Sequence, residues 1–138
     1  MAVRAKEAVT FLLRWVVGAV FVYAGVLKAL DPTQFAADID NFRLLPYLMS
    51  CVVGVYLPWL EIVAGATFAL GVWMRGAALL LGGLLVIFFI ALSSAWFRGL
   101  DISCGCFGRA SNKSNYPLSL LMDAALFAAL CITSRRSK

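Results

Sequence analysis

The 138-residue sequence contains no histidine, and charged residues make up only 14% of it. The lack of imidazole excludes histidine-ligated haem, and also zinc sites or acid–base catalysis that depend on histidine. Hydrophobic residues make up 63% of the chain, and the mean hydropathy is +0.92. A soluble domain of this size cannot bury so much apolar surface. The excess must therefore face a lipid bilayer, the first expected partner.

The net charge of +5 is the other unusual feature of the composition. Such a charge would suit a nucleic-acid-binding protein, but the basic residues stand mainly at the ends of apolar segments, which is a signal of membrane topology. The sequence contains no evident basic groove or row of stacking aromatic residues. We therefore expect no nucleic-acid partner.

Four apolar segments are long enough to cross a bilayer as α-helices. They lie at about residues 8–30, 47–70, 77–97 and 117–133. The sequence therefore predicts an all-α membrane protein, a single domain over residues 1–138 that forms a four-transmembrane-helix bundle. We expect the first span to be retained rather than cleaved as a signal peptide, because its apolar stretch is too long and no small-residue cleavage site follows it.

Lysine and arginine residues set the expected orientation of these spans. Seven of them fall on the side of the two termini, and five fall on the side of the two longer loops, 31–46 and 98–116. The basic tail at 135–138 strengthens this bias. The positive-inside rule then places both termini in the cytoplasm and the two longer loops in the periplasm or at the cell exterior.

A surface helix is expected in the first outer loop. Asp31 can cap such a helix, and Pro32 suits its first position. Its apolar residues recur at helical spacing, namely Phe35, Ile39 and Phe42. The helix should lie in the membrane interface with Arg43 and the acidic residues towards water. It is interpreted either as a cover over the bundle or as a lid or docking surface for a partner.

The second outer loop carries the most specific motif in the chain, Cys104-Gly105-Cys106. Residues i and i+2 reach disulfide geometry readily only through a turn, which Gly105 permits. The resulting ring is small and strained, so it is a poor structural staple but is easily reduced and exchanged. We interpret Cys104 and Cys106 as a thiol–disulfide exchange pair and as the candidate catalytic residues. Arg98 and Arg109 lie nearby in sequence and could stabilise a thiolate.

Other interpretations of this cysteine pair stay open, namely a structural disulfide, a metal site and inert thiols. A closed metal site normally needs four ligands, and no histidine is available, so we expect no metal. Cys51 begins the second span on the same side of the membrane. It is either a third redox cysteine or a small buried residue. Cys131 falls near the opposite side and is assigned no role.

Ionisable residues within the predicted spans are costly in lipid and are usually paired. They are Arg14, Lys28, Glu61 and Asp123. Counting about 1.5 Å of rise per residue from the outer helix ends predicts two pairs, Arg14 with Glu61 and Lys28 with Asp123. Such pairs either fix the helix register or form a polar site open to protons or to a quinone, the one cofactor that we consider.

Small residues in the spans are expected to serve helix packing rather than a site. The residues concerned are Gly18, Gly25, Gly65, Ala69, Gly82 and Gly83. Pro58 removes one helical hydrogen bond, so we expect a kink in the second span just before Trp59 and Glu61.

Taken together, these residues make the sequence resemble the methylamine utilisation protein MauE family, within the broader DoxX-like group. The resemblance covers nearly the whole chain, through residues 18–46, 57–76 and 98–108. The segment RGLDISCGCFG at 98–108 is its most specific part. Lys28, the Asp31-Pro32 and Leu45-Pro46 pairs and the run from Pro58 to Glu61 support it.

The resemblance implies a four-helix inner-membrane protein that helps to mature methylamine dehydrogenase, whose small subunit is rich in disulfides. A thioredoxin-like periplasmic protein is the implied partner, and the dehydrogenase small subunit is a second candidate. Cys104 and Cys106 match the family's cysteine motif, and Lys28 and Glu61 match its polar intramembrane positions. The fourth span matches only loosely around Asp123.

The expected function is therefore an inner-membrane thiol–disulfide redox protein that supports disulfide formation in a periplasmic enzyme. The alternative is a non-catalytic membrane subunit or scaffold, or a quinol-linked respiratory subunit of the DoxX type. In that alternative the cysteine pair is a structural disulfide.

Overall fold

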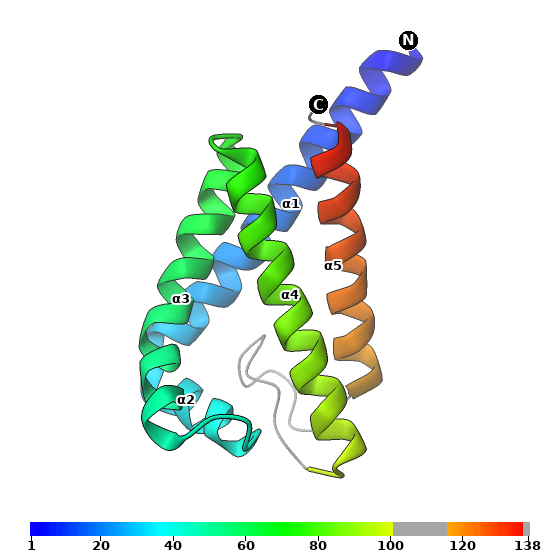
Figure 1. Ribbon diagram of the computed structural model, residues 1–138. Helices are drawn as coiled ribbons and strands as arrows, with labels where there is room; N and C mark the ends of the chain where they lie inside the picture. Colours follow the sequence, from blue (N-terminus) through cyan, green and yellow to red (C-terminus); the bar gives the residue numbers. More distant parts are fainter. Residues whose placement is uncertain (101–115, 137–138) are drawn as a thin grey trace.

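The computed structural model describes residues 1–100 and 116–136, and this part of the chain forms helices joined by short turns (Figure 1). The helices are α1 (Ala2–Leu30), α2 (Pro32–Asn41), α3 (Tyr47–Leu70), α4 (Met74–Phe97) and α5 (Tyr116–Arg136). All except α2 are long and apolar enough to cross a membrane. The predicted all-α bundle of four transmembrane helices is confirmed.

The observed helices extend beyond the apolar segments at several ends. Helix α1 begins at Ala2 rather than near residue 8, and α4 begins at Met74 rather than near residue 77. The added turns contain charged residues such as Lys6 and Arg75. Hydropathy marks only the part of a helix that suits lipid, whereas the helical backbone continues into the more polar layer outside it.

The two ends of the bundle differ in what they contain. The start of α1 and the end of α5 lie at one end with the turn between α3 and α4, which we call the terminal end (Figure 1). Helix α2, the end of α4 and the start of α5 lie at the other, which we call the α2 end. This alternation agrees with four spans. The assignment of the terminal end to the cytoplasm stays a prediction.

Helices α1 and α3 approach each other through glycines. A Cβ atom added to Gly18 would lie 2.6 Å from the Cβ of Ala69 and 2.7 Å from the backbone oxygen of Gly65. One added to Gly25 would lie 2.8 Å from the backbone oxygen of Pro58. The two backbones are therefore in direct contact, and the predicted packing role of these glycines is confirmed.

The α4 glycines behave differently. A Cβ on Gly82 would make only an ordinary contact, 3.5 Å from Cδ2 of Leu130, and one on Gly83 would have nothing within 4 Å. The prediction that Gly83 permits close helix approach is wrong, because this residue faces open space beside α4.

The glycine contacts also fix the antiparallel register of α1 and α3. Gly18 lies against Gly65 and Gly25 against Pro58, so the end of α1 is level with about residue 53 of α3. The first two turns of α3 therefore project about 9 Å beyond α1. Helix α2 fills the space beside this projection, and a Cβ on Gly54 of α3 would lie 2.7 Å from the Cβ of Ala36 of α2.

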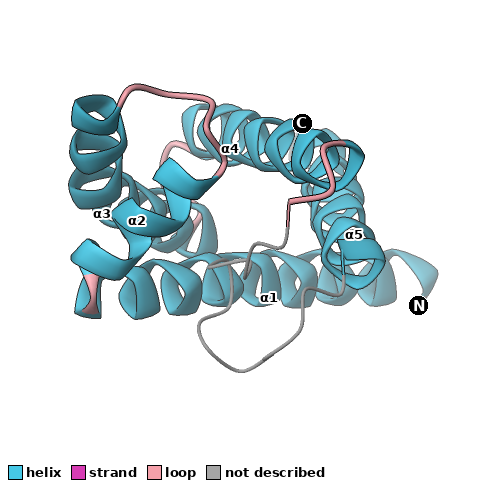
Figure 2. Ribbon diagram, turned by 90° about the horizontal axis from the view of Figure 1, so that it is seen from below, coloured by secondary structure: helices cyan, strands magenta, loops and turns pink. Residues whose placement is uncertain are grey.

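Helix α2 begins as predicted. The Asp31 side chain accepts a hydrogen bond of 3.1 Å from the backbone N–H of Gln34, and Pro32 occupies the first turn. Seen from the α2 end, the helix lies on one side of the bundle, beside α3 and next to α1, away from α5 (Figure 2). Arg98 at the end of α4 donates a hydrogen bond of 2.9 Å to the carbonyl of Phe42. These contacts agree with α2 being a cover over the bundle.

One acidic residue of α2 does not face water as expected. Asp38 is only 8% exposed, and it accepts a hydrogen bond of 3.1 Å from the side-chain amide of Gln34. It lies three residues after the buried Phe35, so the two share the inner face of the helix. The prediction is wrong for Asp38 and correct for the exposed Asp31.

Removing the cap should loosen α2. Asp31→Ala is expected to cost about 1 kcal/mol of local stability, and so to speed amide hydrogen exchange in the first turn of α2 about fivefold. Thr33→Ala, exposed in the same turn, is the control and should leave the rates unchanged. Equal exchange in the two variants would show that the cap does not hold this helix.

Candidate functional site

A buried ion pair joins α1 to α3. The Lys28 Nζ lies 2.8 Å from Oε1 and 3.0 Å from Oε2 of Glu61, so the ammonium donates to both carboxylate oxygens. The side chains are 3% and 1% exposed. A charge buried this deeply requires a partner, and each residue supplies it for the other.

Two aromatic rings complete the surroundings of the Lys28 ammonium. The Phe88 ring of α4 has its centroid 4.6 Å from Nζ, and the Phe35 ring of α2 has its centroid 5.1 Å away. Both distances fall in the range of a cation–π interaction. Four helices thus converge on one ammonium group, which ties the cover helix α2 to the transmembrane bundle.

The predicted pairing of Arg14 with Glu61 is wrong. Glu61 binds Lys28, while the Arg14 guanidinium lies near Gly71, with Nη1 4.0 Å from the sulfur of Met74. The prediction placed the outer ends of α1 and α3 at the same level. Because α3 projects beyond α1, Glu61 lies within reach of the long Lys28 side chain, and Arg14 is level with the end of α3.

The other predicted pair, Lys28 with Asp123, does not form a salt bridge. Lys28 forms its salt bridge with Glu61 instead. The Oδ2 atom of Asp123 is buried and has no hydrogen-bond partner within residues 1–100 and 116–136. The predicted pairing of Lys28 with Asp123 is therefore wrong.

Pro58 lies inside α3, which continues on both sides of it. The residue is fully buried, and its carbonyl oxygen faces Gly25 of α1. Trp59 is 61% exposed and turns away from the bundle. Pro58 therefore lies in the α1–α3 contact one turn from the ion pair, where the absence of its N–H leaves the carbonyl of Gly54 without its usual helical partner.

The candidate catalytic residues Cys104 and Cys106, together with Arg109, lie outside the described residues. The two ends of their segment are described. The Tyr116 hydroxyl at the start of α5 donates a hydrogen bond to the carbonyl of Leu100, just after α4. Leu100 and Tyr116, the described residues that flank 101–115, therefore lie next to each other at the α2 end.

The remaining cysteines lie at opposite ends of the bundle. Cys51 is half-buried in the second turn of α3, at the α2 end, and Cys131 is half-buried near the terminal end. Neither forms a disulfide within the described residues. The position of Cys51 agrees with its predicted side, and its redox role stays a prediction. No cluster of three metal-ligating side chains occurs among the described residues.

Three site residues were not identified from the sequence, namely Phe35 and Phe88 as partners of Lys28, and Tyr116 as the partner of Leu100. Phe35 carried a signal, since it begins the apolar spacing of a helix that follows Lys28 closely. Phe88 lies in an unbroken apolar run, so nothing in the sequence marked it as a partner of Lys28. Tyr116 could be noticed only as a polar aromatic residue at the start of a span.

Comparison with known proteins identifies the family. The family model described as "Methylamine utilisation protein MauE" matches residues 6–134. The chain belongs to the MauE family. The matched range includes the Lys28–Glu61 pair, Asp123 and both cysteines of the Cys-Gly-Cys motif.

Proteins named "Methylamine utilization protein MauE" are the curated relatives of this MauE-family chain. The protein of Paracoccus denitrificans is 33% identical over 118 residues, which cover 85% of this chain and 62% of the relative. That of Methylorubrum extorquens is 35% identical over 108 residues, which cover 78% of this chain and 58% of the relative. The chain thus spans less than two thirds of the length of these relatives. No solved structure matches it.

Proposed function

We propose that this protein is a membrane component of methylamine utilisation and that it carries out thiol–disulfide exchange at the α2 end of its bundle. The names of its relatives support the pathway, and the Cys-Gly-Cys motif supports the chemistry. In the proposed orientation the protein lies in the inner membrane, with the α2 end facing the periplasm and both termini in the cytoplasm.

The observation on which the proposal rests is the hydrogen bond between Tyr116 and Leu100. It brings together Leu100 and Tyr116, the described residues on either side of the segment that contains Cys104 and Cys106, at the α2 end of the bundle. Exchange requires that a sulfur be reached by a second protein. A cysteine outside the spans is open to a soluble partner, whereas a cysteine within a span would not be.

The chemical step is a two-electron exchange with a thioredoxin-like periplasmic protein. A partner thiolate attacks one sulfur of the Cys104–Cys106 disulfide, which forms a mixed disulfide and releases the other cysteine as a thiolate. The second partner thiol then attacks the mixed disulfide. The partner leaves as a disulfide, the pair remains as a dithiol, and two electrons and two protons have moved to the pair.

The same steps in reverse reduce the partner and oxidise the pair. When the partner is the protein that becomes oxidised, a membrane quinone reoxidises the Cys104–Cys106 dithiol. The quinone accepts the two electrons and two protons and becomes a quinol, and the disulfide of the pair is restored. The partner in turn passes its disulfide to the small subunit of methylamine dehydrogenase, the proposed final substrate. In the opposite direction a quinol is the reductant.

Single cysteine variants test this exchange. Cys104→Ala or Cys106→Ala should trap a mixed disulfide with the thioredoxin-like partner, visible as a larger band on a non-reducing gel that reductant removes. The double alanine variant should abolish methylamine-dependent growth. Cys131→Ala, which removes a free thiol near the terminal end, is the matched control and should grow normally.

Two results would discriminate among the remaining possibilities. Normal growth of the Cys104→Ala/Cys106→Ala strain would overturn the proposal and leave a non-catalytic scaffold. Loss of exchange in Cys51→Ala, with the Cys104–Cys106 pair intact, would show that Cys51 is a third redox participant.

A further inference from the structure

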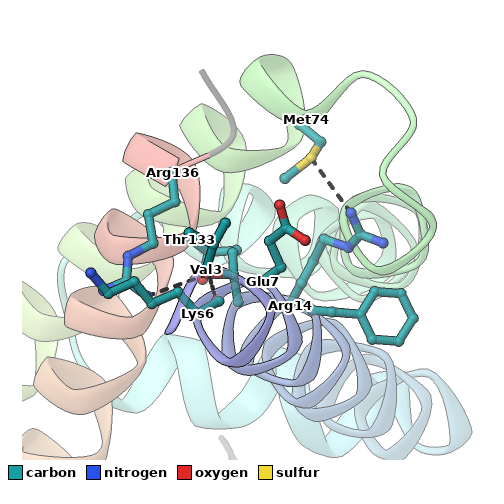
Figure 3. A pocket seen from close by; sticks show the side chains of 9 residues that line it. Val3, Lys6, Glu7, Arg14, Met74, Thr133 and Arg136 are labelled. Carbon is teal, nitrogen blue, oxygen red and sulfur yellow. Dashed lines mark hydrogen bonds between the residues drawn. The ribbon is translucent and has the colours of Figure 1, made fainter. Parts of the chain in front are cut away.

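A second polar site lies at the terminal end, away from the Lys28–Glu61 pair. A cavity of about 440 Å³ opens there between the first turns of α1, the start of α4 and the end of α5 (Figure 3). Its polar lining consists of Lys6, Glu7, Thr10 and Arg14 from α1, and Thr133 and Arg136 from α5. Three of these side chains are cationic and one is acidic.

The cations of this cavity are not neutralised within the described part of the chain. The salt bridge in the described part of the chain is the one between Lys28 and Glu61, outside the cavity. No carboxylate of the described residues lies within 4 Å of the charged nitrogens of Lys6, Arg14 or Arg136. Figure 3 shows Arg14 and Arg136 on opposite sides of the cavity, with Glu7 between them in this view. The lining therefore keeps a net positive charge.

Arg14 is also short of hydrogen-bond acceptors. Its Nε atom is buried and has no partner among the described residues. Its Nη1 faces only the weak acceptor sulfur of Met74 at 4.0 Å, and its carbon Cζ lies 5.2 Å from the centroid of the Phe11 ring. A guanidinium carries five N–H donors, so most of the Arg14 donors have no acceptor within the described part of the chain.

Arg136 is similarly available. Its Nη1 donates to the Thr10 hydroxyl at 3.4 Å, a long contact, while that hydroxyl already donates to the carbonyl of Lys6 at 2.8 Å. A phosphate oxygen is the acceptor that guanidinium groups bind best, through short charge-assisted hydrogen bonds. The lining of the cavity thus contains two guanidinium groups and one ammonium group, all of a kind that binds phosphate.

The level of the cavity indicates where that group comes from. Arg14 lies against Gly71, at the turn between α3 and α4, and the 84% exposed Trp73 marks the same turn. Exposed tryptophan at a helix end is typical of the membrane interface. Phe11, which lines the cavity, is 53% exposed and so offers an apolar surface to an acyl chain.

We infer that this cavity binds the phosphate of an anionic phospholipid headgroup, with Lys6, Arg14 and Arg136 as its ligands and the acyl chains passing Phe11. Glu7 opposes the anion and favours a headgroup that carries a hydroxyl donor in addition to its phosphate, such as the glycerol of phosphatidylglycerol. This inference does not depend on the thiol–disulfide function, because the two sites lie at opposite ends of the bundle.

Lipid binding by the purified full chain in detergent tests the inference. Native mass spectrometry should show phosphatidylglycerol retained in preference to phosphatidylcholine. Lys6→Gln/Arg136→Gln changes two exposed residues and should weaken phosphatidylglycerol binding about thirtyfold. Arg4→Gln/Arg75→Gln removes the same charge at the same end, outside the cavity, and should bind as the parent does.

Each remaining outcome is decisive. Equal binding of the two lipids, or equal weakening in the two double variants, would overturn the inference in favour of diffuse surface charge. Displacement of phosphatidylglycerol by millimolar inorganic phosphate would overturn the lipid and leave a site for a free anion. Arg14→Gln adds a third test, since its loss of lipid binding should match that of the cavity variant when its circular dichroism spectrum is unchanged.

Discussion

Lys28→Met and Glu61→Leu are each expected to lower the free energy of unfolding by about 3–5 kcal/mol, because each leaves the other charge buried without its partner. The double variant should recover most of this loss and unfold within about 2 kcal/mol of the parent. Methionine suits the site of Lys28 because its thioether can contact the rings of Phe35 and Phe88.

Equilibrium unfolding in mixed micelles, followed by helical circular dichroism, measures these differences. Asp123→Asn is the control, since this half-buried residue forms no salt bridge within the described chain, and it should change stability by less than about 1 kcal/mol. Simple addition of the two single losses in the double variant would refute a paired role.

Exchanging the charges of Lys28 and Glu61 should restore less stability than replacing both residues with apolar ones. Lys28→Glu/Glu61→Lys restores opposite charges, but it places a carboxylate where the faces of Phe35 and Phe88 favour a cation. We therefore expect the swapped protein to be more stable than either single reversal and less stable than the apolar double variant.

Gly18→Leu is expected to destabilise the bundle by about 3 kcal/mol or more, at the upper end of the range for overpacking. The first atoms that a new side chain meets are the Cβ of Ala69 at 2.6 Å and the backbone oxygen of Gly65 at 2.7 Å. Neither can move aside as the end of a flexible side chain can, so α1 and α3 must separate.

The same substitution at Gly83 is the matched control for this effect. A Cβ there has nothing within 4 Å, so Gly83→Leu should change the free energy of unfolding by less than about 0.5 kcal/mol. The measurement is again unfolding in mixed micelles. Similar losses at the two positions would mean that glycine is needed for another reason than the contact between α1 and α3.

The spans and the start of α2 could be predicted because each depends on residues that are neighbours in sequence. Twenty apolar residues define a span wherever the other helices lie. Likewise, the cap at Asp31 needs only the N–H of Gln34, three residues later. Such features depend only on residues that lie within one or two helical turns of each other.

The ion pairs depended on something that no local pattern contains, namely the relative height of two helices. The prediction aligned the ends of α1 and α3, whereas the contacts at Gly18 and Gly25 shift α3 by about two turns. The small residues that cause this shift were identified correctly from the sequence. The residues that they contact on the other helix were not predicted. Phe88 and Tyr116 were missed for the same reason, since their partners are distant in sequence.

The projection of α3 beyond α1 also has a consequence for biogenesis. Lys28 lies only two residues before the end of α1, so in a nascent chain its ammonium can snorkel to the headgroup layer while α1 is inserted alone. It becomes enclosed only when α3 brings Glu61 and α2 folds over it. The order of synthesis thus allows the translocon to insert a helix whose lysine acquires its permanent counter-charge later, during helix association.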